Sequence, residues 1–285
     1  IKMVEIKKTN YIKIQDGCSQ KCGYCTVREF RGASVSEPYS AIYQDVKACV
    51  EEHGMKILQL EGVNSIEYND PEVGDIVGLC QRLLKDFPET YFMVGQINPF
   101  AVDRFKRLID LIGSEEKMIK TCLVPIQSAS DTALARMHRP HTKETLRELF
   151  KYAKEKGVEY TIEIIPGFPG ETEEEFMDTY NFLDEVSPVA FWTHAFSARP
   201  GTEAATLPNQ VSEDVIVERM EKYKELQKKV SARYIESLDG KEIMVVVEPI
   251  HGARTIHNIP VNGNFMTEEY IGKYVVHYTD GKLEK

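Results

Sequence analysis

Six short apolar segments, separated by longer amphipathic stretches, constrain the fold of this chain more than any other feature. The segments lie at 11–15, 56–61, 91–95, 119–126, 160–165 and 190–196. They are rich in Ile, Val, Phe and Tyr, and the stretches between them have the apolar spacing of helices. Strands that alternate with helices pair in parallel, because each return to the same edge of the sheet needs a crossover. The sequence therefore predicts an α/β fold with six βα units.

A long charged helix predicted at 212–236 ends this pattern, and the residues after it differ. Ile243, Val245 and Val247 alternate with their neighbours, and turn residues separate further short apolar segments. A period of two is typical of strands with one buried face. We therefore expect two domains, an α/β domain at 1–236 and a small all-β domain at 237–285, most simply an OB-like barrel.

Composition and charge exclude several classes of protein. The 285 residues are 42% hydrophobic and 28% charged, and no apolar run reaches the roughly 20 residues of a membrane helix, so we expect no membrane span. The net charge of −10 argues against broad, nonspecific phosphate binding, which depends on Lys and Arg. Six cysteines are few for a disulfide scaffold of this length, which favours a reducing, cytoplasmic compartment.

Three of the cysteines lie within eight residues, directly after the first predicted strand. Cys18, Cys22 and Cys25 have CxxxCxxC spacing, and flanking glycines let the backbone turn sharply. Iron–sulfur clusters take thiolate ligands, and three ligands leave one iron free to bind a reactant. The alternative is zinc, but tetrahedral zinc takes four ligands, and no fourth Cys or His lies at finger or ribbon spacing. The motif favours an open [4Fe–4S] cluster on a loop at a strand end, where α/β barrels carry reactive groups.

With an aromatic residue, Tyr24, before its last cysteine, this motif resembles that of the radical S-adenosylmethionine (SAM) superfamily. The resemblance implies a partial (β/α)6 barrel of the TIM type, which matches the six βα units. It also implies that the three cysteines bind the cluster, that Tyr24 belongs to the cofactor site, and that SAM chelates the free iron. Electron transfer then cleaves SAM, and the 5′-deoxyadenosyl radical abstracts hydrogen from an unactivated C–H bond.

Several further segments resemble the methylthiotransferases of this superfamily. They are Arg31-Gly32, LEGVN at 60–64, PIQSASD at 125–131, RMHRPHT at 136–142, IIPGFPGET at 164–172 and FSARPGT at 196–202. These enzymes insert a methylthio group into tRNA adenosines or into an aspartate of a ribosomal protein. They end in a small β-barrel called TRAM, which residues 237–285 resemble.

Members of that family usually begin with a further domain that carries a second [4Fe–4S] cluster, the source of the inserted sulfur. This sequence shows no such domain, and it begins with Ile1. We therefore expect either a fragment of a longer enzyme or a reduced relative with another sulfur source. The remaining cysteines, which we expect to be buried apolar residues rather than ligands, are Cys49, Cys80 and Cys122.

Residues at the ends of the predicted strands are candidates for contacts with SAM. The resemblance implies that Glu61 and Gly62 hold the methionine end of SAM, and an ordinary turn is the alternative. It also implies that Gln127 and Ser128 make polar contacts to SAM or to the substrate. Capping of the following helix is the alternative for these two residues.

The loop after the fifth predicted strand contains Gly167 and Phe168 within the sequence PGFPG. Its glycines let the main chain approach an adenine closely, and a tight βα turn is the alternative. Glu163 lies within the strand, where burial of an unpaired carboxylate is costly. We expect Glu163 to have a partner, such as the SAM ribose or an arginine, or to face a polar barrel interior.

Other side chains have less specific signals. Arg31 and Arg199 are candidates for contacts with phosphate or carboxylate groups of the substrate through their planar guanidinium groups. We expect His138 and His141 at the solvated surface. Trp192, the only tryptophan, is expected in the core.

These features lead first to the hypothesis of a methylthiotransferase that acts on tRNA, with flavodoxin or ferredoxin as the reductant. Residues 237–285 carry five Lys or Arg and seven Asp or Glu, which fits a basic protein partner better than RNA. Modification of a ribosomal protein or another peptide is therefore the second hypothesis. A non-catalytic relative that binds RNA or protein is the third.

Overall fold

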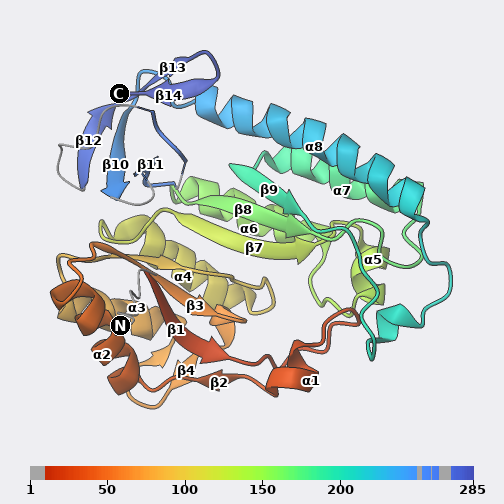
Figure 1. Ribbon diagram of the computed structural model, residues 1–285, viewed down its shortest axis with the longest axis horizontal. Coiled ribbons are helices and arrows are strands. Elements are labelled where there is room, and N and C mark those ends of the chain that lie inside the picture. The colour runs from red at the N-terminus through yellow and green to blue at the C-terminus, as the bar shows by residue number, and fades with distance from the viewer. Residues whose placement is uncertain (1–9, 249–251, 258, 263–270) are drawn as a thin grey trace, which may run out of the picture.

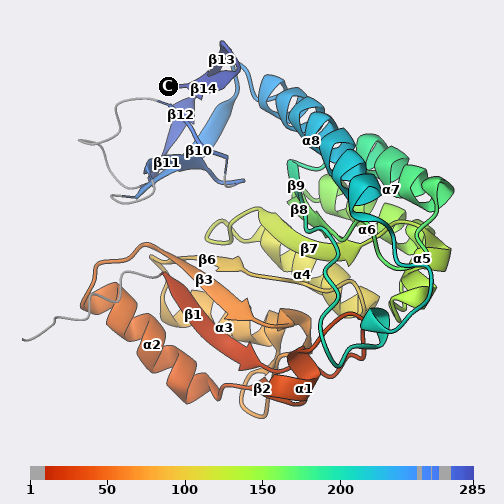
Figure 2. The same ribbon diagram turned by 45° about the vertical axis from the view of Figure 1, so that its right-hand side comes forward.

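A curved parallel sheet of six strands forms the centre of the computed structural model, which describes residues 10–248, 252–257, 259–262 and 271–285. Helices cover one side of this sheet (Figures 1 and 2). The strands are β1 (Tyr11–Asp16), β3 (Ile57–Gly62), β6 (Tyr91–Val94), β7 (Thr121–Gln127), β8 (Glu159–Ile164) and β9 (Ala190–Thr193). All six predicted strands are confirmed.

The six strands are arranged in their order along the chain. Parallel ladders join β1 to β3, β3 to β6, β7 to β8 and β8 to β9. Parallel bridges at Phe92–Met118 and Gln96–Leu123 join the two halves of the sheet between β6 and β7. The free edge of β1 pairs with the short antiparallel strand β2 (Val35–Ser36). The sheet therefore curls into a half-barrel.

Helices alternate with these strands, as the sequence predicts. α7 begins directly after Thr172, which caps it and forms a capping box with Glu175. Within the described residues, no helix combines the length and apolarity needed to cross a bilayer. The helices are α1 (Val27–Arg31), α2 (Tyr39–Glu51), α3 (Ile76–Asp86), α4 (Val102–Ser114), α5 (Asp131–Arg136), α6 (Lys143–Glu155), α7 (Glu173–Val186) and α8 (Glu213–Glu236). The shorter elements are the 3-10 turns η1 (Ser65–Glu67) and η2 (Glu203–Ala205) and the hairpin of β4 (Asn69–Asp70) and β5 (Gly74–Asp75).

The two faces of the sheet differ in polarity. Ile12, Ile14, Leu58 and Leu60 face the helices and are at most 2% exposed. Because successive strand residues point to opposite faces, Glu61 faces the interior of the half-barrel instead. The apolar core therefore lies between the sheet and its helices, and the inner face remains available to polar groups.

The residues after α8 form antiparallel strands, as their alternation predicts. β10 pairs with β11 and β12, and β13 pairs with β14. We call these strands the β module. They are β10 (Glu242–Glu248), β11 (Gly252–Thr255), β12 (Ile271–Val275), β13 (His277–Thr279) and β14 (Lys282–Glu284).

The β module packs against one end of the half-barrel. Val245, Val276 and Leu283 of the module share an apolar cluster with Tyr91 and Ile119, which lie where β6 and β7 begin. The loop after β1 lies near the other end of the strands (Figure 2). We call the first the module end and the second the cysteine end.

Candidate functional site

The three motif cysteines lie on one loop between β1 and α1. Cys18, Cys22 and Cys25 are free thiols and are partly exposed. The loop turns sharply at Gly17, whose φ is +67° and where a Cβ would clash with the Ala33 carbonyl oxygen. Only glycine adopts this backbone without strain, so the predicted role of glycine before the first cysteine is confirmed.

Loops from other strands hold the cysteine loop in place. The Glu67 carboxylate, in the loop after β3, accepts hydrogen bonds from the Ser19 N–H at 2.9 Å and from Gln20 Nε2 at 2.7 Å. Farther along, the Gly23 N–H donates to the Met137 carbonyl at 3.2 Å. The loop is thus fixed by segments that follow β3 and β7.

The sulfur atoms have donors as neighbours. Asn64 Nδ2 lies 3.8 Å from Cys18 Sγ, and Arg139 Nη1 lies 3.7 Å from Cys22 Sγ. Burial raises the pKa of the Cys18 thiol. Among the described residues, no three His, Cys, Asp or Glu side chains are grouped closely enough to hold a single metal ion. The donor set fits a [4Fe–4S] cluster, because three soft, partly exposed thiols share one loop and two of them face N–H donors.

Two carboxylates line the interior of the half-barrel. Gln59 Nε2 donates to Glu61, and Gln96 Nε2 donates to Glu163 Oε2 at 2.9 Å. Gly95 makes room for Glu61, since a Cβ there would lie 2.5 Å from its Oε2. Burial raises the pKa of both carboxyl groups, and the charge of Glu163 adds to the effect on Glu61.

Glu163 has the milder of its two predicted environments. Its partners in the described structure are Gln96 and His194, whose Nε2 lies 3.9 Å from Glu163 Oε1. It thus faces the polar interior without an arginine partner. A role toward the SAM ribose stays a prediction.

The end of β7 contains a strained residue and a buried hydroxyl. Gln127 has a φ of +71°, which is uncommon outside glycine, and its buried Oε1 has no hydrogen-bond partner in the described structure. Ser128 is 1% exposed, and its hydroxyl contacts Thr179 Oγ1 at 3.1 Å and accepts from the Ser130 N–H at 3.1 Å. The unpaired Gln127 Oε1 can therefore accept a hydrogen bond from a ligand. The Ser128 hydroxyl bonds the N–H of Ser130, the residue before α5, rather than an N–H within that helix, so the role of Ser128 stays a prediction.

The PGFPG loop packs against the cysteine loop. Phe168 is fully buried, and its ring meets Tyr24 edge to face with ring centres 6.4 Å apart. The Gly167 N–H donates to Glu171 Oε2 at 2.7 Å, and a φ of +83° makes glycine the suitable residue there. Contact of the Gly167 and Phe168 main chain with a cofactor stays a prediction.

The two candidate substrate arginines are both exposed. Arg31 pairs with Asp16 at 3.3 Å, and its side chain is 58% exposed. Arg199 is also exposed. Their proposed roles stay predictions.

Two expectations from the sequence are wrong. Trp192 is 47% exposed rather than buried. His141 is only 4% exposed, because its ring stacks on Phe100 and its Nε2 lies 3.2 Å from the Ile126 carbonyl oxygen. The expectation that His138 lies at the surface is confirmed, because its side chain is 47% exposed. Its Nε2 pairs with Glu203 at 2.7 Å. Cys80 and Cys122 are buried, and Cys49 packs against the core.

Asn64 and Arg139 were given no role from the sequence, although they lie in two of the segments that carry the resemblance. Both are buried. The signal in the sequence that could have found Asn64 is its place two residues after the end of an apolar strand, where polar side chains enter the site.

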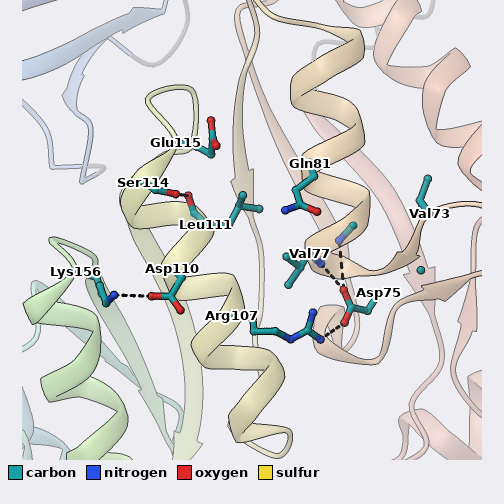
Figure 3. A pocket seen from close by; sticks show the side chains of 12 residues that line it. Val73, Asp75, Val77, Gln81, Arg107, Asp110, Leu111, Ser114, Glu115 and Lys156 are labelled. Atoms are coloured by element: carbon teal, nitrogen blue, oxygen red, sulfur yellow. Dashed lines mark hydrogen bonds and ion pairs between the residues drawn. The ribbon is translucent and has the colours of Figure 1, made fainter.

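A surface hollow of about 810 Å³ lies elsewhere, between α3 and α4 (Figure 3). Two ion pairs lie in its lining, Arg107 with Asp75 and Lys156 with Asp110 at 2.8 Å. It contains none of the residues predicted for the site.

Comparisons with known proteins agree with this geometry. The family model described as Radical SAM superfamily matches residues 12–183. The tRNA-2-methylthio-N(6)-dimethylallyladenosine synthase of Fusobacterium nucleatum is 34% identical over 244 residues, which are 85% of this chain and 56% of the relative. The threonylcarbamoyladenosine tRNA methylthiotransferase MtaB of Treponema pallidum is 31% identical over 240 residues, 83% of this chain and 48% of the relative. The chain thus spans about half the length of the curated relatives it matches.

Solved structures share the fold at low sequence identity. The radical SAM methyltransferase TsrM from Kitasatospora setae, with cobalamin and a [4Fe–4S] cluster bound, has a TM-score of 0.58 and 13% identity, covering 69% of this chain and 36% of that chain. Methylornithine synthase (PylB) has a TM-score of 0.51 and 13% identity, covering 76% and 62%. Membership in the matched family implies a [4Fe–4S] cluster and SAM as cofactors. With its six-stranded half-barrel and the family match over more than half of its length, the chain belongs to the radical SAM superfamily.

Proposed function

We propose that this chain carries the radical SAM part of a methylthiotransferase that modifies tRNA. The observation that carries the proposal is the loop of three free thiols at the cysteine end, with Asn64 and Arg139 beside two of its sulfur atoms. The names of the relatives above, which are tRNA methylthiotransferases, support tRNA as the substrate.

Cys18, Cys22 and Cys25 would hold the cluster, and the loop contacts described above would keep them in position. When bound, the cluster and SAM supply a radical that abstracts hydrogen from an unactivated C–H bond. The chain itself contributes orientation and exclusion of water. The partly buried Tyr24 packs against Phe168, so the cysteine loop contacts the PGFPG turn on this side.

The remaining SAM contacts are proposed for residues on the neighbouring strand ends. The unpartnered Gln127 Oε1 supports a polar contact there, because a buried acceptor without a donor is destabilising until a ligand supplies one. Glu61 and Gly62 would hold the methionine end, and Glu163 the ribose. The main chain at Gly167 and Phe168 would lie along the adenine.

We propose that 237–285 is a TRAM-like domain of OB type that follows the radical SAM domain of 1–236. Its antiparallel pairing supports this assignment. The excess of acidic residues keeps a basic peptide, such as a ribosomal protein, as the second candidate substrate. The second [4Fe–4S] cluster, a flavodoxin or ferredoxin reductant and a cytoplasmic location stay predictions, and so do substrate contacts by Arg31 and Arg199.

The test is incubation of the anaerobically reconstituted protein with SAM, reductant and either tRNA or ribosomal proteins. Mass spectrometry of digested tRNA and of peptides detects the methylthio group, and 5′-deoxyadenosine reports SAM cleavage. We expect a methylthio-adenosine in tRNA. Methylthio-aspartate in protein with unchanged tRNA would support the second substrate. If a protein loaded with cluster yields no 5′-deoxyadenosine, the non-catalytic hypothesis is correct.

A further inference from the structure

Two of the three motif cysteines face an N–H donor from a distant part of the chain. Asn64 Nδ2 lies 3.8 Å from Cys18 Sγ, and Arg139 Nη1 lies 3.7 Å from Cys22 Sγ. The first donor is a neutral amide and the second is a cation. Both side chains are buried, with 0% of Asn64 and 6% of Arg139 exposed.

Two other buried amides fix the orientation of Asn64. The side-chain Oδ1 of Asn64 accepts from Asn98 Nδ2 at 3.0 Å, and the backbone N–H of Asn64 donates to Gln15 Oε1 at 2.9 Å. Because Oδ1 is already an acceptor for Asn98, the amide group of Asn64 can present only its N–H side to Cys18. These three amides lie at the ends of β1, β3 and β6, so the half-barrel itself holds the donor in place.

Arg139 is a buried cation without a carboxylate partner among the described residues. Its Nη2 donates to the Pro125 carbonyl, its Nη1 lies 3.5 Å from the Tyr24 hydroxyl, and its guanidinium lies 4.4 Å from the centre of the Phe100 ring. None of these groups carries a negative charge. Burial of a charge without a counter-ion is costly, so an anion is expected here. A Cys22 thiolate bound to iron meets this need.

We propose that Asn64 and Arg139 set the reduction potential of the [4Fe–4S] cluster. This inference rests on the assignment of the cluster to the three cysteines. Reduction adds one negative charge, part of which is carried by the sulfur atoms. N–H donors and a nearby positive charge stabilise that charge, so both residues raise the potential. They are positioning residues, since they act through the cysteine ligands.

The test is a redox titration of the reconstituted protein without SAM, with dithionite as the one-electron reductant and mediator dyes. The EPR signal of the reduced cluster measures the ratio of reduced to oxidised cluster. In Arg139→Gln this ratio at a fixed potential should fall about tenfold, a shift of about 59 mV to more negative potential. Asn64→Leu should lower the ratio about threefold, because a neutral hydrogen bond is weaker than a charged one. Arg139→Lys should lie between wild type and Arg139→Gln.

Two neighbouring residues provide matched controls. Arg136→Gln removes an arginine of the same segment whose charge is already paired with Glu175. Asn69→Leu removes an exposed asparagine that follows the same strand as Asn64. Both should have the wild-type potential.

Iron and sulfide analysis identifies variants that do not load the cluster. If Asn64→Leu does not load the cluster, Asn98→Leu is measured instead. Asn98→Leu removes the group that orients the Asn64 amide but keeps the amide itself. The reduction potential should then shift in the same direction by a smaller amount. The inference would be overturned if an Arg139 variant and an Asn64 or Asn98 variant, each measured separately, both load the cluster fully and both have the wild-type potential. A wild-type protein that takes up no [4Fe–4S] cluster would instead contradict the proposed function.

Discussion

The two ends of the half-barrel are built differently. At the module end, Tyr91 and Ile119 are at most 5% exposed and pack against Val245, Val276 and Leu283. At the cysteine end, the three thiols are partly exposed and the buried neighbours are amides and a guanidinium. In α/β barrels the C-terminal ends of the strands carry chemistry and the opposite ends carry stability. Substitutions at the two ends should therefore separate activity from stability.

The largest effect is expected from a single cysteine at the cysteine end. Cys22→Ala should abolish SAM cleavage, because a cluster with two thiolates is not held firmly. The free energy of unfolding should change by less than about 1 kcal/mol, since the side chain is partly exposed. Iron content and 5′-deoxyadenosine measure the first effect, and urea denaturation of the apo protein measures the second.

Cys49→Ala is the matched control, because Cys49 packs against the core on α2, outside the motif loop. It should keep full iron content and SAM cleavage. Equal loss of iron in both variants would show that the motif loop has no special role.

The opposite result is expected at the module end. Ile119→Ala removes a buried side chain from the apolar cluster and should destabilise the protein by about 2–5 kcal/mol. Iron content per folded chain should remain at the wild-type value. Urea denaturation measures the loss, and Val35→Ala, at a position 66% exposed near the cysteine end, is the control with little expected change. A loss below about 1 kcal/mol for Ile119→Ala would mean that the β module does not close this end.

The sequence predicts the strands of the β module and the frame of the barrel well, because both follow from local patterns. Alternation of Ile12 and Ile14 with polar neighbours places β1, and the same period places β10. The three cysteines are also a local signal, since their spacing alone indicates one cluster site. Local patterns therefore account for the strands, the helices and the proposed cluster ligands.

The cysteine end depends on contacts that local patterns do not contain. Asn64 and Cys18 are 46 residues apart in the chain, and Arg139 and Cys22 are 117 apart. Which loop meets which sulfur is decided by the curvature of the sheet. His141 was misplaced for the same reason, because Phe100, the ring that covers it, comes from the loop after β6.

A smaller effect is expected from His141, and it depends on pH. Burial, together with the positive charge of Arg139, lowers the pKa of His141 to about 3. The unfolded chain takes up this proton below about pH 6.5, and the folded protein takes it up only near pH 3. The contribution of His141 to stability is thus complete above pH 6.5 and is lost as the pH falls toward 3, about 2 kcal/mol of it by pH 5.

His141→Gln should remove this part of the acid sensitivity of the cysteine end. Between pH 7 and pH 5, the free energy of unfolding of the variant should fall by about 2 kcal/mol less than that of the wild type. Urea denaturation at both pH values measures the difference. His53→Gln, at an exposed position after α2, should behave as wild type. An equal fall in His141→Gln and wild type would show that His141 is not the residue responsible.

The smallest effect on the free energy of unfolding is expected from replacing Trp192, although its side chain is large. Trp192 pairs in register with Glu163 and lies on the inner face of the half-barrel, 47% exposed, whereas its neighbour Phe191 faces the helices and is fully buried. Trp192→Ala should change the free energy of unfolding by less than about 0.5 kcal/mol, and Phe191→Ala should lower it by about 3–5 kcal/mol. Circular dichroism during urea denaturation compares the two variants without relying on tryptophan fluorescence. A similar loss of unfolding free energy in both variants would mean that the inner face is packed as tightly as the core. The contrast between the polar cysteine end and the apolar module end would then not extend into the interior of the half-barrel. The expected inequality would show instead that the inner face, like the cysteine end, contributes little to stability.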